Sequence, residues 1–367
     1  MVYRALGLMS GSSLDGVDIA FVEFLEAAGK WSYTVLAADC LPYSDDWTDK
    51  LQNATNLPAR DYLLLHAEYG HYLGKQVNQF IAQHNLDYQV QLIASHGHTS
   101  FHLPAQRMTA QLGDGAAIAA ETGINVVSDL RAIDIALGGQ GAPIVPIGEK
   151  LLWGDFEVLL NIGGIANISI HEPNRTIAFD LCAANRVLNL LAEELGKTYD
   201  DKGMIAASGQ LNNDLLGELN QLDYYKNPFP KSLANEFGTH TVFPLLKNTG
   251  LSVPDQLHTY TLHIAEQVKQ GILLANPNQA WKSDHPQILV TGGGAHNDFL
   301  IQSIQEAVQP LNCTLVKPSI EVIDYKEAIV MALIGVLRWR ENNNVLASVT
   351  GASRDSIGGA VYIGQQA

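Results

Sequence analysis

The stretch LGLMSGSSLDGVDIA, residues 6–20, carries the strongest fold signal in this chain of 367 residues. Apolar residues stand on both sides of a short run of glycine, serine and aspartate, which predicts a strand, a tight turn and a second strand. Small residues at such a turn let backbone N–H groups approach a ligand closely, and serine hydroxyls add donors. The turn therefore suits phosphate binding, although ordinary hairpin turns use the same residue types.

The same pattern returns about 150 residues further along the chain. Residues 156–162 are apolar, Gly163 and Gly164 form a turn, and residues 167–171 continue as a second strand. The repeat predicts two related α/β domains. Hydrophobic periodicity predicts strands at residues 3–9, 17–24, 32–38, 90–95, 125–129, 176–179, 287–290 and 348–363, and helices at 59–85, 114–122, 185–195, from 298, and 322–342.

A third glycine cluster, TGGGAHN at residues 291–297, follows the expected strand 287–290. Such a cluster is also what a strand-to-helix loop with positive φ requires. The third glycine of a dinucleotide-binding fingerprint is missing at its required spacing, which argues against a dinucleotide. Three glycine-rich strand ends in one chain together favour a nucleotide site.

Composition restricts the possible functions. Hydrophobic residues make up 47% and charged residues 16%, so the chain can bury large cores. The net charge of −16 argues against nucleic acid as a partner. No apolar stretch reaches the roughly 18 residues of a membrane span, and the first residues lack the pattern of a secretory signal. Three cysteines without metal-like spacing predict neither disulfides nor zinc, so we expect a cytoplasmic protein.

Several motifs in the same order resemble the anhydro-N-acetylmuramic acid kinases, within the acetate/sugar-kinase and actin-like superfamily. The motifs are GLMSGSSLDGVD (7–18), SHGHTSFHLP (95–104), DLRAIDIALGGQGAPIVP (129–146), NIGGIAN (161–167), TGGGAHN (291–297), EAIVMA (327–332) and VTGASR (349–354). They span nearly the whole chain.

The resemblance implies an α/β fold of two actin-like (ribonuclease H-like) domains, each a mixed sheet with flanking helices, around a nucleotide cleft. We expect one domain at residues 1–135 plus about 343–367, and the other at 136–342. The implied enzyme opens the 1,6-anhydro ring of anhydro-N-acetylmuramic acid with water and phosphorylates the 6-hydroxyl from ATP with Mg²⁺. This reaction recycles peptidoglycan in the cytoplasm, and the family usually forms homodimers.

The nucleotide-binding residues are expected in the three glycine-rich segments. They are Gly11, Ser12, Ser13, Leu14, Asp15, Gly16, Val17, Asp18, Gly163, Gly164, Gly292, Gly293, Gly294 and Asn297. Asp15 and Asp18 are the candidates for holding Mg²⁺ through water. Alternatively, both are aspartates of a turn that are simply exposed to solvent.

Asp180 follows the expected strand 176–179 and precedes the expected helix. It can cap that helix, or it can be the general base at the carboxyl end of a strand. The resemblance favours the base. The family usually reads DTGPGN where this chain reads DLCAAN at residues 180–185. Loss of both glycines implies a helical conformation at this point or a reshaped pocket.

The resemblance places Glu327 at the sugar, and Arg131, His96, Thr99 and Asn185 are further candidates for binding it. Arg131 can meet the lactyl carboxylate of the sugar or orient Asp180. Glu327 can equally close a capping box with Asp324 at a helix start, and Arg131 can form a surface ion pair. His96, His98 and His102 have a spacing that zinc could use, but hydrogen bonds to sugar hydroxyls or to backbone are the favoured interpretation.

Two alternatives to the kinase remain open at this point. One is a non-catalytic relative that binds a nucleotide or sugar, and the other is a kinase for another anhydro sugar. Both are motivated by the altered residues 181–184.

Overall fold

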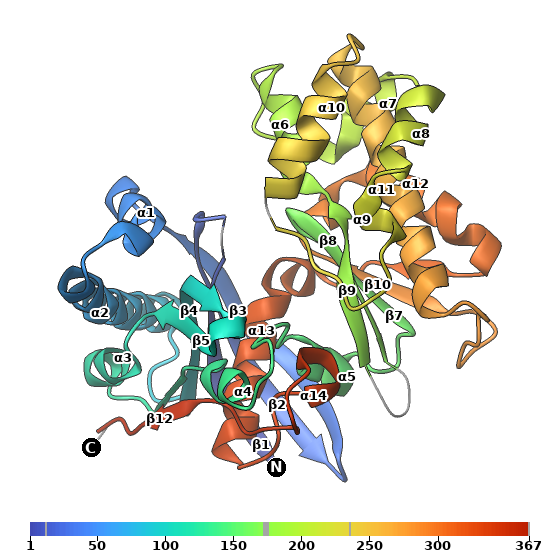
Figure 1. The fold of residues 1–367 in the computed structure, drawn as a ribbon. Helices are drawn as coiled ribbons and strands as arrows, with labels where there is room; N and C mark the ends of the chain where they lie inside the picture. Colours follow the sequence, from blue (N-terminus) through green and yellow to red (C-terminus); the bar gives the residue numbers. More distant parts are fainter. Residues whose placement is uncertain (12, 172–175, 235, 366–367) are drawn as a thin grey trace. The chain divides into compact units, whose positions relative to one another are not determined.

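The computed structural model describes residues 1–11, 13–171, 176–234 and 236–365, and its contacts divide the chain into two units (Figure 1). Unit 1 comprises Met1–Trp153 and Tyr325–Ala367, and unit 2 comprises Gly154–Asp324. Each unit has its own hydrophobic core, built from the inward faces of its sheet and the helices that cover it. Each unit therefore meets the requirement for a folding domain.

Unit 1 is built on a mixed sheet with the strand order β12-β6-β4-β1-β2-β3, in which β5 pairs with β4. β1 is antiparallel to β2 and parallel to β4. The elements of this unit are β1 (Val2–Ser10), β2 (Gly16–Ala27), β3 (Lys30–Pro42), α1 (Asp45–Gln52), α2 (Ala59–His84), β4 (Leu92–Leu103), β5 (Met108–Leu112), α3 (Gly115–Thr122), β6 (Val126–Ser128), α4 (Ala132–Ala136), α5 (Pro146–Leu152), most of α13 (Ile320–Trp339), α14 (Ala347–Thr350) and β12 (Ala360–Tyr362).

Unit 2 is built on a mixed sheet with the strand order β11-β10-β7-β8-β9. Its elements are β7 (Val158–Ile162), β8 (Ile165–His171), β9 (Thr176–Ala183), α6 (Asn185–Glu193), α7 (Met204–Ser208), α8 (Asn213–Asn220), α9 (Asp223–Lys226), α10 (Phe243–Lys247), α11 (Val253–Ala275), β10 (Gln287–Thr291), α12 (Asp298–Val308) and β11 (Thr314–Val316), with a short 3₁₀ helix at Gly293–His296.

The five-stranded sheet of unit 2 has the same topology as five strands of the seven-stranded sheet of unit 1, namely β6-β4-β1-β2-β3. In each, three consecutive strands pair antiparallel, and the first of them pairs on its other side with a parallel strand that comes later in the chain. This arrangement confirms the predicted α/β class, with a mixed ribonuclease H-like sheet and flanking helices in each unit. The repeated strand–glycine turn–strand pattern in the sequence is the signal that predicts it.

Most expected elements near the two turns are confirmed, and one is wrong. Residues 348–363 do not form a long strand, because the chain there makes the helical turn α14, an irregular segment and the short strand β12. Gly351 and Gly359 adopt positive φ of 76° and 110°, which interrupts a strand. The helices α7 to α11, between residues 204 and 275, were not predicted from sequence.

The contacts group residues 136–153 and 325–342 with unit 1, whereas the sequence analysis assigned them to the second domain. The physical reason is the packing of α5 against α13. Lys326 Nζ lies 2.9 Å from Glu149 Oε1, and the two side chains are only 4% and 5% exposed. Tyr325 has non-helical φ and ψ of −115° and 16°, so α13 is kinked where the two units divide.

Two glycines let the buried, apolar part of α13 approach the sheet of unit 1. A Cβ on Gly7 in β1 would lie 1.8 Å from the carbonyl oxygen of Ala328. A Cβ on Gly335 would lie 2.5 Å from the Cβ of Ala94 in β4. The apolar run in α13 is thus explained by burial against β1 and β4. Among the described residues, no helix combines the length and the apolarity that a membrane crossing needs.

Replacing Gly7 by alanine is expected to lower the free energy of unfolding by about 1–3 kcal/mol, since the added methyl group forces α13 away from β1. Urea unfolding of the full chain measures the change. Gly217→Ala in α8 is the matched control, because a Cβ there meets nothing within 4 Å. A helical Gly→Ala change without a clash should leave stability unchanged or raise it slightly. An equal loss of stability in both variants would contradict the packing argument.

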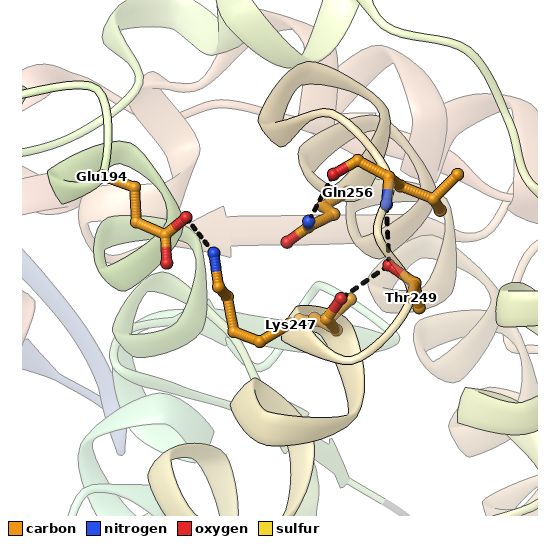
Figure 2. A network of polar contacts seen from close by, with 6 residues as sticks. Glu194, Lys247, Thr249 and Gln256 are labelled. Carbon is orange, nitrogen blue, oxygen red and sulfur yellow. Dashed lines mark hydrogen bonds and ion pairs between the residues drawn. The ribbon is translucent and has the colours of Figure 1, made fainter.

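A polar network in unit 2 ties the C-terminal end of α6 to the segment between α10 and α11 (Figure 2). The Lys247 ammonium donates to the Glu194 carboxylate just after α6. Thr249 Oγ1 accepts a hydrogen bond of 3.3 Å from the Leu251 N–H, and the Gln256 amide donates to Leu251 O at 2.8 Å. The Lys247–Glu194 ion pair is the contact of this network that reaches the end of α6, and the opposite end of that helix carries Asn185, one of the predicted site residues.

Candidate active site

The β1–β2 turn of unit 1 forms as the sequence predicts. Gly11, Ser13, Leu14 and Asp15 lie in the turn or at its ends, whereas Gly16, Val17 and Asp18 begin β2. Asp15 Oδ1 accepts hydrogen bonds from Ser13 Oγ at 2.7 Å and from the Gly16 N–H at 3.0 Å. Ser12 lies outside the described residues.

A buried series of hydrogen bonds, not expected from the sequence, supports this turn. Ser10, the last residue of β1, has its Oγ 2.7 Å from Tyr43 Oη and 3.0 Å from His98 Nδ1. Tyr43 is in turn hydrogen-bonded to Tyr69. Burial lowers the pKa of His98 and raises the pKa of both tyrosines, so all three side chains are neutral near pH 7. These residues are far apart in sequence, so no local sequence pattern predicts the hydrogen bonds between them.

Arg131 and His96 contact each other directly in unit 1. Arg131 Nε donates to His96 Nε2 at 2.8 Å, and Arg131 Nη1 donates to Gly141 O at 2.6 Å. A guanidinium can only donate, so His96 carries its proton on Nδ1, which donates to Gly97 O at 2.9 Å. Burial, helped by the Arg131 charge, lowers the pKa of His96 to about 3. His96 is therefore a neutral hydrogen-bonding residue.

These contacts bear on two of the alternatives. Arg131 binds a histidine and a carbonyl group, so a surface ion pair does not explain it. Both ring nitrogens of His96 are occupied, and the described part of the chain holds no group of three or more potential metal ligands. His98 and His102 also make hydrogen bonds through Nδ1, with Ser10 Oγ and Thr109 Oγ1. Thr99 is exposed on β4, 3.5 Å from the Gln111 amide.

Glu327 lies on α13 close enough to Arg131 to influence it. Burial lowers the pKa of Arg131 to about 10, and the negative charge of Glu327 acts in the opposite direction. Glu327 lies inside α13, two residues after the kink at Tyr325, and no hydrogen bond joins it to Asp324 in the part of the chain that the structure describes. Asp324 instead accepts a hydrogen bond from His296 Nε2 at 2.7 Å. Arg131, His96 and Glu327 thus form one cluster in unit 1.

Asp180 does not cap a helix, because β9 continues to Ala183 and the N-cap of α6 is Ala184. Its Oδ2 accepts a hydrogen bond of 2.8 Å from the Leu233 N–H, and its backbone carbonyl accepts one of 2.7 Å from Tyr224 Oη. Burial raises the pKa of Asp180, and the Leu233 N–H opposes that shift. A raised pKa makes a carboxylate a stronger base, as general-base catalysis requires.

The altered residues 181–184 are not helical: residues 181–183 belong to β9 and Ala184 is the N-cap of α6. Each of the four is at most 2% exposed. Leu181 packs against α11, where a Cβ on Gly271 would lie 2.1 Å from Leu181 Cδ2. Tyr260 Oη donates to Ala183 O at 2.7 Å. The substitutions relative to the family pattern are therefore accommodated by the core of unit 2.

The glycine-rich segments of unit 2 meet at the carboxyl ends of β7 and β10, the edge at which α/β sheets bind ligands. The Asn185 N–H donates to Gly163 O at 3.0 Å, and the Asn185 amide donates to Ile162 O at 3.2 Å. A Cβ on Gly293 would lie 3.5 Å from the same amide nitrogen. The structure thus brings Gly163, Gly164, Asn185 and residues 292–294 together.

Two members of the third glycine cluster have structural explanations. Gly292 has φ of 80°, and a Cβ on it would lie 2.7 Å from Asn161 Oδ1, so only glycine fits. Asn297 caps α12, since its Oδ1 accepts a hydrogen bond of 2.9 Å from the Leu300 N–H. The helix cap accounts for Asn297 without a nucleotide.

The chain is similar to known proteins over nearly its whole length. A family model described as "Anhydro-N-acetylmuramic acid kinase" matches residues 3–364. Three curated relatives have that same name. The one from Salinibacter ruber is 34% identical and covers 95% of this chain and 93% of its own length. The one from Hydrogenovibrio crunogenus is 32% identical, with 97% of each chain covered. The one from Synechococcus elongatus is 34% identical, with 98% and 99% covered.

One solved structure that is similar to this chain is the activator of the 2-hydroxyisocaproyl-CoA dehydratase from Clostridium difficile with bound ADPNP. The similarity covers 92% of this chain and 96% of the activator chain. Its identity is 13% and its TM-score is 0.41.

Proposed function

Because the chain belongs to the anhydro-N-acetylmuramic acid kinase family, we propose that it uses ATP to open the 1,6-anhydro ring of anhydro-N-acetylmuramic acid and phosphorylate its 6-hydroxyl. The product is N-acetylmuramic acid 6-phosphate. The observation that carries this proposal is Asp180, a partly buried carboxylate with a raised pKa that caps no helix.

Asp180 acts as the general base in this proposal. It removes a proton from the water that attacks the anomeric carbon, and the bond from that carbon to O6 breaks. O6 bonds to the γ-phosphorus as the bond from that phosphorus to ADP breaks. Ordinary glycoside hydrolysis needs a second carboxyl group to protonate the leaving oxygen. Here the phosphoryl group captures that oxygen, so one carboxylate is sufficient.

The glycine-rich segments bind the nucleotide in this proposal. The turn of unit 1 and the Gly163–Gly164 turn of unit 2 donate to phosphate oxygens, and residues 292–294 lie under the adenosine. Asp15 and Asp18 fit a Mg²⁺ ion bound mainly by phosphates and water, since Mg²⁺ usually takes only one or two protein carboxylates. Bound there, the ion neutralises phosphate charge.

The sugar is bound by the cluster around Arg131. The guanidinium suits the lactyl carboxylate, and its contacts with His96 and Gly141 hold it in one orientation. Glu327, Thr99 and Asn185 supply further polar groups for sugar hydroxyls. The proposal places the protein in the cytoplasm, where it recycles peptidoglycan fragments as a homodimer.

Release of ADP in the presence of the anhydro sugar tests this function. We expect turnover with anhydro-N-acetylmuramic acid and little with levoglucosan, which lacks the lactyl group. Sugar-dependent turnover would exclude a non-catalytic binding protein. Faster turnover with levoglucosan would show that the substrate is another anhydro sugar.

The pH dependence of kcat/KM for the sugar, at saturating nucleotide, is expected to reflect Asp180. The base must be ionised, so activity falls as the pH drops through its pKa. Because burial raises this pKa, the fall should begin above the pH at which an exposed aspartate titrates. An acid limb at or below the ordinary aspartate value of about 4 would count against this assignment.

A further inference from the structure

Arg186, the second residue of α6, lies along the Gly163–Gly164 turn of unit 2. Its backbone N–H donates to Gly164 O at 3.4 Å. A Cβ built on Gly164 would lie 3.8 Å from both Cβ and Nε of Arg186, and one on Gly238 would lie 3.9 Å from its Cδ. The Arg186 side chain therefore runs between Gly164 and Gly238, beside the Gly163–Gly164 turn.

The guanidinium of Arg186 has no partner among the described residues. Its Nε is buried and makes no hydrogen bond, and no carboxylate lies within ion-pair distance in that part of the chain. A buried N–H donor without an acceptor is unfavourable, and more so when the group is charged. The opposite end of α6 differs, because the Lys247 ammonium there is paired with Glu194 (Figure 2).

Arg186 thus combines a permanent positive charge, an unsatisfied donor and contact with a glycine turn. Planar guanidinium groups bind phosphate oxygens through two parallel hydrogen bonds. The chain has a net charge of −16, so a polyphosphate needs local positive charge to bind. The N-terminus of the nine-residue helix α6 adds a partial positive charge at the same place.

We propose that Arg186 binds the terminal phosphate of the nucleotide, the phosphoryl group that is transferred. This inference rests on the proposed function and extends it to a residue outside the glycine-rich segments. Arg186 offsets the charge on the phosphoryl oxygens while O6 replaces ADP as the group bonded to phosphorus. It contacts the reacting phosphate and is in that sense a catalytic residue.

Calorimetric binding of ADP and of the non-hydrolysable β,γ-imido analogue of ATP tests the proposal. Arg186→Met keeps most of the side-chain volume and removes the charge. We expect it to weaken binding of the analogue by about 10- to 100-fold, the range for a lost charged hydrogen bond, and to leave ADP binding within about twofold. Arg186→Lys should recover part of the loss, because it keeps the charge without the planar geometry.

Lys247→Met is the matched control, because it also removes one positive charge from unit 2 near α6. Both nucleotides should bind it as they bind the unaltered protein. Equal weakening of ADP and the analogue in Arg186→Met, or no weakening of either, would overturn the proposal. So would weaker binding of the anhydro sugar alone, since Arg186 would then bind its carboxylate.

If the unaltered protein binds neither nucleotide, the proposed function fails, and the role of Arg186 fails with it. If it binds both and Arg186→Met does not distinguish them, only the role of Arg186 fails. Should Arg186→Met not fold, Arg186→Lys alone decides, since a contact with the terminal phosphate still predicts a selective loss of analogue binding.

Discussion

Asp180→Asn is expected to lower kcat by about 10²–10⁴, the usual effect of losing a general base. Asparagine has nearly the same shape, and its side-chain oxygen can still accept the hydrogen bond from the Leu233 N–H. The variant should therefore keep the conformation of β9 but cannot remove a proton from water. Steady-state ADP release with the anhydro sugar measures kcat, and calorimetry should show unchanged binding of the ATP analogue.

Asp223→Asn is the matched control for this change. It makes the same chemical substitution in unit 2, at a carboxylate whose side chain is 99% exposed and paired with Lys226. Its turnover should equal that of the unaltered protein. Near-normal kcat in Asp180→Asn would contradict the role of Asp180 as base.

Lys326→Met is expected to lower the free energy of unfolding by about 3–5 kcal/mol, the usual effect of removing one partner of a buried ion pair. Glu149 would remain in the interior of unit 1 without its cation, and its Oε2 already has no hydrogen-bond partner among the described residues. Urea unfolding, followed by tryptophan fluorescence, measures the loss. Trp153, which packs against Tyr33 in the same unit, contributes to that signal.

Two further variants make this result interpretable. Lys326→Met combined with Glu149→Leu should recover most of the stability, since no charge is then left buried. Lys50→Met removes a lysine from an exposed pair with Asp46 and Glu68, and it should change stability by less than about 1 kcal/mol. If Lys326→Met and Lys50→Met lowered the free energy of unfolding by similar amounts, burial would not be what makes the Lys326–Glu149 pair important.

Local patterns in the sequence were sufficient to predict most strands of both sheets, although β5 and β11 were missed. They placed Asp180 just after a strand, whereas that strand, β9, continues to Ala183. The two strand–glycine turn–strand repeats fix strands that pair with their neighbours in sequence, so short-range information identifies them. The capping alternative for Asp180 could not be excluded in this way, because it depends on where β9 ends. Alanines at 183 and 184 are equally compatible with a helix, and only the coordinates show that β9 includes Ala183 and that α6 begins after Ala184.

Contacts between distant residues account for what sequence reasoning missed. The partners of Ser10 lie at positions 43 and 98, and the partner of Lys326 lies 177 residues away. The sequence around Arg186 did not indicate a binding residue, because an arginine in the first turn of a helix is ordinary. Its significance depends on the absence of a partner among the described residues and on its contact with Gly164, which require coordinates.

The division of unit 1 into two chain segments affects how the protein is made. Unit 2 is continuous, so a ribosome delivers all of it before the residues that complete unit 1. Until α13 emerges, the faces of β1 and β4 at Gly7 and Ala94 lack their cover. A nascent chain that stops short of Tyr325 would expose this apolar surface, so premature termination should yield aggregation-prone fragments rather than a partly active enzyme.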